Sequence, residues 1–281
     1  MDEEFRRICL EAVRRALDED LRSEGDITSR AVIPPEMRGK GVVVLREEGV
    51  VAGLPLASMA FRLLDPRLRF QPLVGDGDRP AAPAEIAVVE GKVSSILEGE
   101  RTALNFLQRL SGVATLTSRF VAAAAPHGVE ILDTRKTTPG LRALEKYAVR
   151  AGGGKNHRFG LYDGVLIKDN HVAAVGGTAE AVRRAREVLG PEANIEVEVK
   201  DLEELEEAIQ AGADVVMLDN MGVEEVREAV RLARGRVKLE VSGGINLENV
   251  ASYASTGVDF ISVGALTHSA PALDIALELC L

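Results

Sequence analysis

The basic residues between positions 133 and 171 are of the right type to bind a small, multiply charged anion. This segment carries eight Lys and Arg against four Asp and Glu, a charge of +4 in a chain whose net charge is −10. Exposed helix charges explain some of these cations. Arg135, Lys136 and Lys168, however, directly follow apolar strand-like runs and should point into a site. Because arginines such as Arg135 and Arg158 grip carboxylates bidentately, the pattern predicts a multiply anionic ligand.

Acidic residues form a second candidate group. In the run Ile195–Val199, strand alternation places Glu196 and Glu198 on one face and the valines on the other. Glu198 is nearer the carboxyl end and is the functional candidate, whereas Glu196 is expected to be a structural partner of a cation. Asp219 ends the next strand-like run in the same way. Such carboxylates can hold Mg²⁺ through water, bind sugar hydroxyls or stabilise developing positive charge.

Glycines follow the last two strand-like runs. Ser242-Gly243-Gly244 and Gly264-Ala265 stand where helix N-termini often form a phosphate cradle. A tight turn would explain either motif alone, but two such motifs favour phosphate binding. His268 either assists or caps a helix.

The elements that must position these residues change in character along the chain. An amphipathic helix opens the sequence, and irregularly spaced strands and helices follow, which indicates an α+β unit. The expected strands cover 41–45, 68–74 and 85–89, and the expected helices cover 56–64 and 95–125, the latter broken near Ser111-Gly112. After Gly128, short β-branched runs alternate with amphipathic helices. This alternation is typical of βα units with a parallel sheet.

A doubly wound sheet and a (β/α) barrel both fit this alternation. From Glu198 to Asp219 and from Asp219 to Glu240 is 21 residues each, the length of one strand and one helix. Polar residues at successive strand ends converge on one mouth only in a barrel. Six strands are clear and a seventh is possible at 157–161. The sequence therefore favours an incomplete barrel with TIM-like strand–helix repeats.

Composition limits the function classes. The chain has 281 residues, of which 46% are hydrophobic and 28% charged. This profile is typical of a soluble globular protein. Its acidity argues against nucleic acid and anionic membranes as partners, and no apolar run is long enough for a membrane span. With no signal peptide pattern and only two distant cysteines, a cytoplasmic location is expected.

Long motifs throughout the chain resemble one family. They are GDIT at 25–28, ERTALNFLQRLSGVAT at 100–115, DTRKTTPG at 133–140, KYAVRAGGGKNHRFGLYDG at 146–164, IKDNH at 167–171, and further on EVEV, MLDN, VSGGI and SVGALTHS. On these motifs the chain is similar to the quinolinate phosphoribosyltransferases, the carboxylating nicotinate-nucleotide pyrophosphorylases of NAD biosynthesis.

The resemblance implies an α/β fold of two domains. An N-terminal α/β sandwich over 1–111 would be rejoined by a C-terminal helix over 270–281, and an incomplete α/β barrel over 112–269 would carry the active site. It also implies a homodimer whose active site is shared between chains, with further assembly left open. The activity implied is transfer of a phosphoribosyl group from phosphoribosyl pyrophosphate to quinolinate with decarboxylation, with Mg²⁺ as cofactor.

The resemblance also implies roles for individual residues. Arg101 would reach the neighbour's quinolinate. Lys136, Lys168, Glu198 and Asp219 would be catalytic, with Mg²⁺ held mainly through the substrate's pyrophosphate and Glu198 and Asp219 nearby. The full set of implied substrate-binding residues is Arg101, Thr134, Arg135, Lys136, His157, Arg158, Lys168, Glu198, Asp219, Ser242, Gly243, Gly244, Gly264, Ala265 and His268.

Two alternatives remain open from the sequence. One is a phosphoribosyltransferase that uses another pyridine or anionic acceptor. The other is a noncatalytic sensor of a phosphorylated ligand on a barrel scaffold. The presence of Lys168, Glu198 and Asp219 disfavours the sensor, because buried charged groups without a use are costly.

Overall fold

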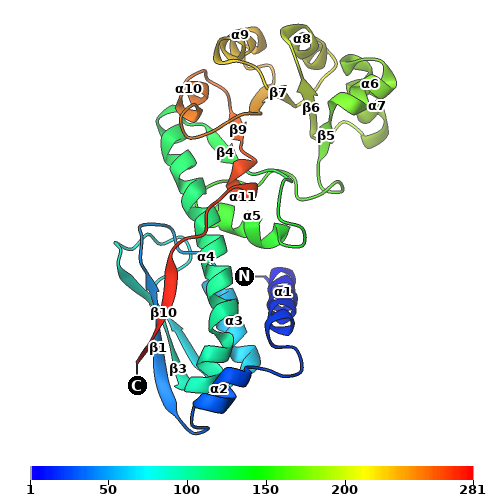
Figure 1. Cartoon of the computed structure of the whole chain (residues 1–281). Helices are drawn as coiled ribbons and strands as arrows, with labels where there is room; N and C mark the ends of the chain where they lie inside the picture. The colour runs from blue at the N-terminus through cyan, green and yellow to red at the C-terminus, as the bar shows by residue number, and fades with distance from the viewer. Residues whose placement is uncertain (1, 281) are drawn as a thin grey trace. The chain divides into compact units, whose positions relative to one another are not determined.

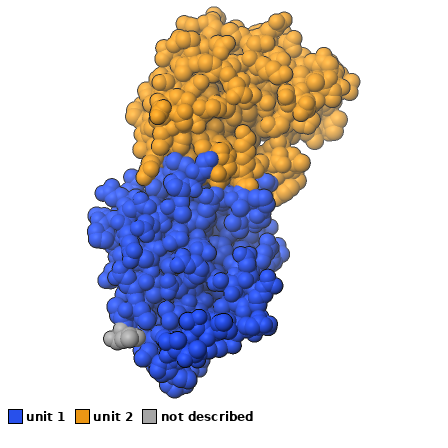
Figure 2. Space-filling model, in the orientation of Figure 1, with its two compact units in different colours: residues 1–118, 138–153, 269–281 blue, residues 119–137, 154–268 orange. Residues whose placement is uncertain are grey.

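The computed structural model describes residues 2–280, which form two compact units (Figures 1 and 2). Unit 1 contains the residues up to Ser118, Thr138–Gly153 and the residues from Ser269 onward. Unit 2 contains Arg119–Thr137 and Gly154–His268. The segment 138–153 thus belongs with unit 1, whereas the sequence places it in the barrel domain.

Unit 1 combines a four-stranded antiparallel sheet with helices. Its sheet has the order β10-β1-β3-β2. The first helix, α1, is capped by Asp2, whose side chain accepts a hydrogen bond from the amide of Phe5, and it buries Cys9, Val13 and Leu17 at four-residue spacing. The elements of unit 1 are α1 (Glu3–Leu21), α2 (Ile27–Val32), β1 (Arg38–Leu45), α3 (Leu54–Leu64), β2 (Arg69–Pro72), β3 (Ala84–Lys92), α5 (Arg142–Ala151), β10 (Ile275–Cys280) and the first part of α4 (Val93–Ala124).

Helix α4 runs unbroken through Ser111-Gly112, so the expected break there is wrong. The glycine serves packing instead. A Cβ atom on Gly112 would lie 2.0 Å from the carbonyl oxygen of Pro271. Glycine at this position therefore lets the C-terminal segment approach the helix backbone closely.

The C-terminal helix expected over 270–281 is also wrong, because Ile275–Cys280 forms strand β10. This strand pairs antiparallel with β1, from Lys40 opposite Cys280 to Leu45 opposite Ile275 (Figure 1). Pairing there satisfies the otherwise open edge of β1, and this tertiary interaction outweighs the helix propensity of the residues.

Unit 2 is built on six parallel strands in the order β4-β9-β8-β7-β6-β5. From β5 to β9 each strand lies beside the next one in sequence, and β4 lies beside β9. This cyclic order is that of a barrel with an opening between β4 and β5, whereas a doubly wound sheet would reverse direction. The strands are β4 (Glu130–Leu132), β5 (Val165–Ile167), β6 (Ile195–Val199), β7 (Val215–Asp219), β8 (Lys238–Ser242) and β9 (Phe260–Ser262).

The possible seventh strand at 157–161 does not form; in that region only an isolated bridge joins Lys155 to Leu132. The incomplete barrel is confirmed. Its helices are amphipathic, as α8 shows by burying Leu205 and Ala208. The helices of unit 2 are α6 (Asp169–Val175), α7 (Thr178–Leu189), α8 (Leu202–Gln210), α9 (Val223–Ala233), α10 (Val250–Ala254) and α11 (Ala265–His268), with a 3-10 turn over Ala125–His127. Within residues 2–280, no helix combines the length and apolarity that crossing a bilayer requires.

Candidate active site

A cavity of about 530 Å³ in unit 2 lies at the carboxyl ends of the parallel strands. Each of the six strands contributes a residue within it or just beyond its end. Nine of the residues named from the sequence therefore meet in one place, although their positions in the chain span more than a hundred residues. These nine are Thr134, Arg135, Lys136, His157, Arg158, Lys168, Glu198, Asp219 and Ser242.

The glycines named from the sequence stand beside this cavity and are not among its lining residues. A Cβ on Gly264 would lie 3.1 Å from Cδ of Lys136 and 3.2 Å from Nε2 of His268, so these three residues are neighbours. Gly243 and Gly244 both have left-handed backbone angles, and Ala265 begins α11. The helices that follow, α10 and α11, are short, with five and four residues.

Arg101 belongs to unit 1, where it lines a separate cavity of about 280 Å³ between α1 and α4. Arg109 and Leu141 line the same cavity. Arg101 is therefore not among the residues that line the barrel cavity.

Buried Asp133 fixes the loops that carry the cations. It ends β4, is fully buried, and accepts hydrogen bonds from the His157 amide at 2.9 Å and from Nδ2 of Asn156 at 2.5 Å. The loop that carries Lys136 is held in a similar way, because the hydroxyl of Thr267 in α11 donates to the Lys136 carbonyl at 2.7 Å. The loops 134–136 and 156–158 are thus fixed by hydrogen bonds to buried groups, which preorganises their cationic side chains.

Two guanidinium groups in the cavity repel each other. Burial and the nearby charge of Arg135 lower the pKa of Arg158 below its ordinary value. The Arg158 side chain donates to the carbonyl of Gly164 at 3.0 Å, while its buried Nε has no hydrogen-bond partner. Like charges held together at a partly buried site are stabilised by an anion between them. The arrangement is therefore suited to a ligand with carboxylate groups.

The same cavity carries two carboxylates, those of Glu198 and Asp219. Lys168 Nζ lies 2.9 Å from Oε2 of Glu198, which comes from the neighbouring strand. Asn220 Nδ2 donates to Oδ2 of Asp219 at 2.8 Å at the end of β7. Four cationic side chains thus share the cavity with two carboxylates, so the site can bind an anion and also stabilise positive charge.

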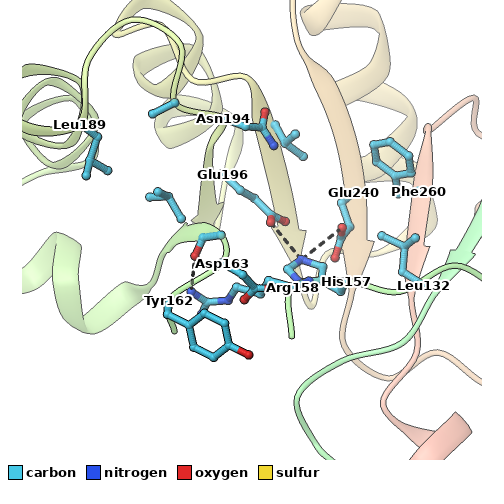
Figure 3. Close-up of a pocket in the computed structure, with 14 residues that line it drawn as sticks. Leu132, His157, Arg158, Tyr162, Asp163, Leu189, Asn194, Glu196, Glu240 and Phe260 are labelled. Carbon is cyan, nitrogen blue, oxygen red and sulfur yellow. Dashed lines mark hydrogen bonds and ion pairs between the residues drawn. The ribbon is translucent and has the colours of Figure 1, made fainter. Parts of the chain in front are cut away.

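A second cavity, of about 560 Å³, lies in unit 2 beside residues in the earlier parts of the strands, among them Val165, Glu196 and Val215 (Figure 3). His157 and Arg158 line both cavities. The carboxylates of Glu196 on β6 and Glu240 on β8 point at the His157 ring, with Nε2 lying 2.9 Å from Oε2 of Glu196 and 3.8 Å from Oε2 of Glu240. Glu196 is thus the structural partner of an imidazole, in line with its expected role. Burial, together with the charge of Glu196, raises the pKa of Glu240 to about 7.

The raised pKa of Glu240 predicts a pH dependence of stability. In the unfolded chain Glu240 loses its proton near pH 4.5, whereas in the folded protein it keeps the proton up to about pH 7. Stability contributed by the protonated group is therefore present below pH 4.5 and is lost as the pH rises to 7. Glutamine cannot ionise, so Glu240→Gln should flatten the pH dependence of the free energy of unfolding.

Urea unfolding of wild type and Glu240→Gln at pH 5, 6, 7 and 8 measures this effect. The difference in unfolding free energy should shift in favour of the variant as the pH rises. Parallel curves over this range would contradict the raised pKa.

The sequence reasoning missed several residues that shape the site. Asn220 lines the cavity with φ +57°, and a Cβ on Gly243 would lie 2.2 Å from its side-chain oxygen. Its position directly after Asp219 was the signal that could have revealed it. Met217 and Ser262 also line the cavity. Met217 lies two residues before the end of β7 and Ser262 is the last residue of β9, positions where alternation points every second residue inward.

Comparison with known proteins shows similarity along almost the whole chain. The family model "Quinolinate phosphoribosyl transferase, N-terminal domain" matches residues 26–111, and "Quinolinate phosphoribosyl transferase, C-terminal domain" matches residues 113–278. A probable nicotinate-nucleotide pyrophosphorylase [carboxylating] of Bacillus subtilis is 48% identical over 92% of this chain and 89% of its own. The chloroplastic enzyme of that name from Arabidopsis thaliana is 43% identical over 95% and 81%. The solved nicotinate-nucleotide pyrophosphorylase of Francisella tularensis is 44% identical, covers 98% of this chain and 97% of its own, and superposes with a TM-score of 0.94.

Proposed function

The chain belongs to the quinolinate phosphoribosyltransferase family, and from this membership and its cavity we infer what it does with each substrate. It is a nicotinate-nucleotide pyrophosphorylase of the carboxylating type. It transfers the phosphoribosyl group of phosphoribosyl pyrophosphate to quinolinate. The products are nicotinate mononucleotide, pyrophosphate and CO₂, in the de novo synthesis of NAD.

The pair Arg135 and Arg158 is the observation that supports quinolinate as the acceptor. Quinolinate carries two carboxylates on adjacent ring carbons, and the two guanidinium groups repel each other until an anion neutralises them. Lys136 and Lys168, in the same cavity, add further positive charge. We place the acceptor among these four side chains, where bidentate contacts would also fix the orientation of its ring.

Glu198 and Asp219 face the phosphoribosyl donor in this proposal. As the pyridine nitrogen bonds to the anomeric carbon and pyrophosphate departs, positive charge develops on the ribose. Carboxylates at the strand ends stabilise an oxocarbenium-like state of this kind. Lys168, with its Nζ 2.9 Å from Oε2 of Glu198, orients that carboxylate. Ser242, Gly243, Gly244, Gly264, Ala265 and His268 stand where the donor's phosphate end would bind.

Decarboxylation follows from the same geometry. Bond formation leaves the pyridine nitrogen positively charged, and the adjacent carboxylate then departs as CO₂. The electron pair stays on the ring carbon beside the cationic nitrogen, which stabilises it until a proton arrives. The protein's part is to hold the remaining carboxylate and the ring in place, a task for Arg135 and Arg158.

The carboxylates of the cavity fit Mg²⁺ by donor type, since hard oxygen ligands are those that this ion prefers. Glu198 and Asp219 would lie near an Mg²⁺ that is held mainly by the pyrophosphate of the donor. The ion would neutralise charge on the leaving group.

A homodimer with a shared active site completes the proposal. Arg101 lines a cavity of unit 1, separate from the barrel cavity, and would reach the quinolinate of a second chain. A cytoplasmic location, and the absence of nucleic-acid and membrane partners, stay predictions from the composition.

Quinolinate-dependent release of CO₂ tests this function. Purified protein with phosphoribosyl pyrophosphate, quinolinate and Mg²⁺ should form CO₂ and nicotinate mononucleotide in equal amounts, and chelation of Mg²⁺ should stop both. Nicotinate as the acceptor cannot release CO₂ and is the matched control. Product with another pyridine but not with quinolinate would indicate a different acceptor. Binding of phosphoribosyl pyrophosphate without turnover on any acceptor would favour a sensor.

A further inference from the structure

We propose that Glu196 is a positioning residue for the acceptor, acting through the His157 ring on Arg158. This proposal rests on the proposed function, in which Arg158 binds quinolinate. The Glu196 side chain lines the second cavity and lies on the face of β6 that also carries Glu198. The contacts that support it connect Glu196, His157 and Arg158 in series.

Both nitrogens of the His157 ring contact the protein. Nδ1 accepts a hydrogen bond from the backbone amide of Arg158 at 2.8 Å. An accepting Nδ1 carries no proton, so a neutral ring must carry its proton on Nε2. Nε2 lies 2.9 Å from Oε2 of Glu196 and donates to it. With these two contacts, the ring is a link between Glu196 and the backbone of Arg158.

The same hydrogen-bond pattern argues against a metal ion at this cluster. His157, Glu196 and Glu240 each offer a ligand atom, and these atoms lie within 4.8 Å of one another. A neutral histidine that binds a metal through Nε2 carries its proton on Nδ1, and a protonated Nδ1 could not accept the hydrogen bond from the Arg158 amide. The bond to Nδ1 therefore favours a hydrogen-bonded cluster over a metal centre.

The last residue in this series is Arg158, whose guanidinium group we assign to the acceptor. The His157 amide is fixed by Asp133, and its ring by Glu196, so the chain enters Arg158 in a defined direction. The Arg158 side chain then turns to the Gly164 carbonyl, which leaves its Nε without a hydrogen-bond partner. A tilt of the ring would displace the Arg158 amide and, with it, the side chain.

Glu240 limits the movement of this link. Glu240 lies on β8, which β7 separates from the strand of Glu196, and its Oε2 is 3.8 Å from Nε2 of His157. The carboxyl groups of Glu196 and Glu240 are both buried, and they also hydrogen-bond to each other. This contact holds both acids beside the His157 ring.

Glu196→Ala, Glu196→Gln and the surface control Glu187→Ala test the proposal. Alanine removes the acceptor of the Nε2 proton, whereas glutamine retains an acceptor oxygen in the same place. We expect Glu196→Ala to raise the KM for quinolinate about tenfold or more, with kcat and the KM for phosphoribosyl pyrophosphate changed less than about threefold. Glu196→Gln should recover most of the affinity, and Glu187→Ala should match wild type.

A double-mutant cycle with Arg158→Lys separates positioning from a general loss of structure. If Glu196 acts through Arg158, Glu196→Ala should add less than about twofold to the quinolinate KM in the Arg158→Lys background. If Glu196→Ala does not fold, Glu196→Asp replaces it. Aspartate keeps the charge but withdraws the oxygen, and should raise the same KM about threefold or more.

Three results would overturn the proposal. They are an unchanged quinolinate KM in Glu196→Ala, additive effects in the cycle, and stoichiometric Zn²⁺ or Mn²⁺ in the wild type that Glu196→Ala loses. A wild-type protein that does not turn over quinolinate would instead overturn the proposed function. The two failures are therefore distinguishable.

Discussion

Replacing Arg135 by alanine should weaken quinolinate binding strongly and leave the binding of phosphoribosyl pyrophosphate largely intact. Removal of a guanidinium that holds a carboxylate in a partly buried site weakens binding by about 3 kcal/mol, roughly a hundredfold. The loss also removes the repulsion that lowers the pKa of Arg158, so a bound anion has less repulsion to neutralise and the affinity falls further. Isothermal titration calorimetry with each substrate separately measures both affinities.

Arg227→Ala is the matched control for this prediction. Arg227 lies in the same unit, on the exposed surface of α9, where its Nη1 is 3.7 Å from Glu224. Its removal takes away the same charge and should not change either affinity. Unchanged quinolinate affinity in Arg135→Ala would show that the acceptor binds elsewhere.

Mixing two inactive variants should restore activity if the active site is shared between chains. Arg101→Ala damages the part contributed to the neighbour, and Lys168→Ala damages the barrel cavity of its own chain. After random subunit exchange, half of the dimers are mixed, and each mixed dimer has one intact site. The CO₂ release assay should therefore recover to about a quarter of wild-type activity.

A mixture of Arg135→Ala with Lys168→Ala is the control for complementation. Both changes lie in the barrel cavity, so every site of a mixed dimer keeps one of them and no activity should return. Size-exclusion chromatography of differently tagged chains establishes that subunits have exchanged. Recovery in the control, or none in the Arg101 mixture after exchange, would contradict a shared site.

Most of the barrel cavity could be predicted from the sequence because strand periodicity is a local property. The alternation in Ile195–Val199 correctly placed the two glutamates on one face, and each lines a cavity of unit 2. The regular spacing of Glu198, Asp219 and Glu240 reflects one repeated strand–helix unit. Glu198 and Asp219 meet at one mouth despite their distance along the chain, whereas Glu240, two residues before the end of β8, lines the second cavity.

Features that depend on contacts between distant segments could not be predicted in the same way. From the sequence, Gly112 predicts a break in helix α4, because the close approach of the Pro271 carbonyl that requires this glycine is visible only in the fold. The residues of β10 have no pattern that distinguishes a helix from a strand, and only the open edge of β1 decides. The dual contacts of His157 also require the fold, since Glu196 and Arg158 reach its ring from different elements.

The position of β10 in the chain has a consequence for biosynthesis. This strand pairs with β1, yet the ribosome makes all of unit 2 between them. Unit 1 therefore cannot complete its sheet before unit 2 has been made, and the emerging chain carries an unprotected edge of β1 during that time. Unit 2, whose strands pair with close neighbours in sequence apart from β4, can assemble most of its sheet earlier. Chaperone binding to the nascent chain should accordingly concentrate on β1, and release should follow the arrival of β10.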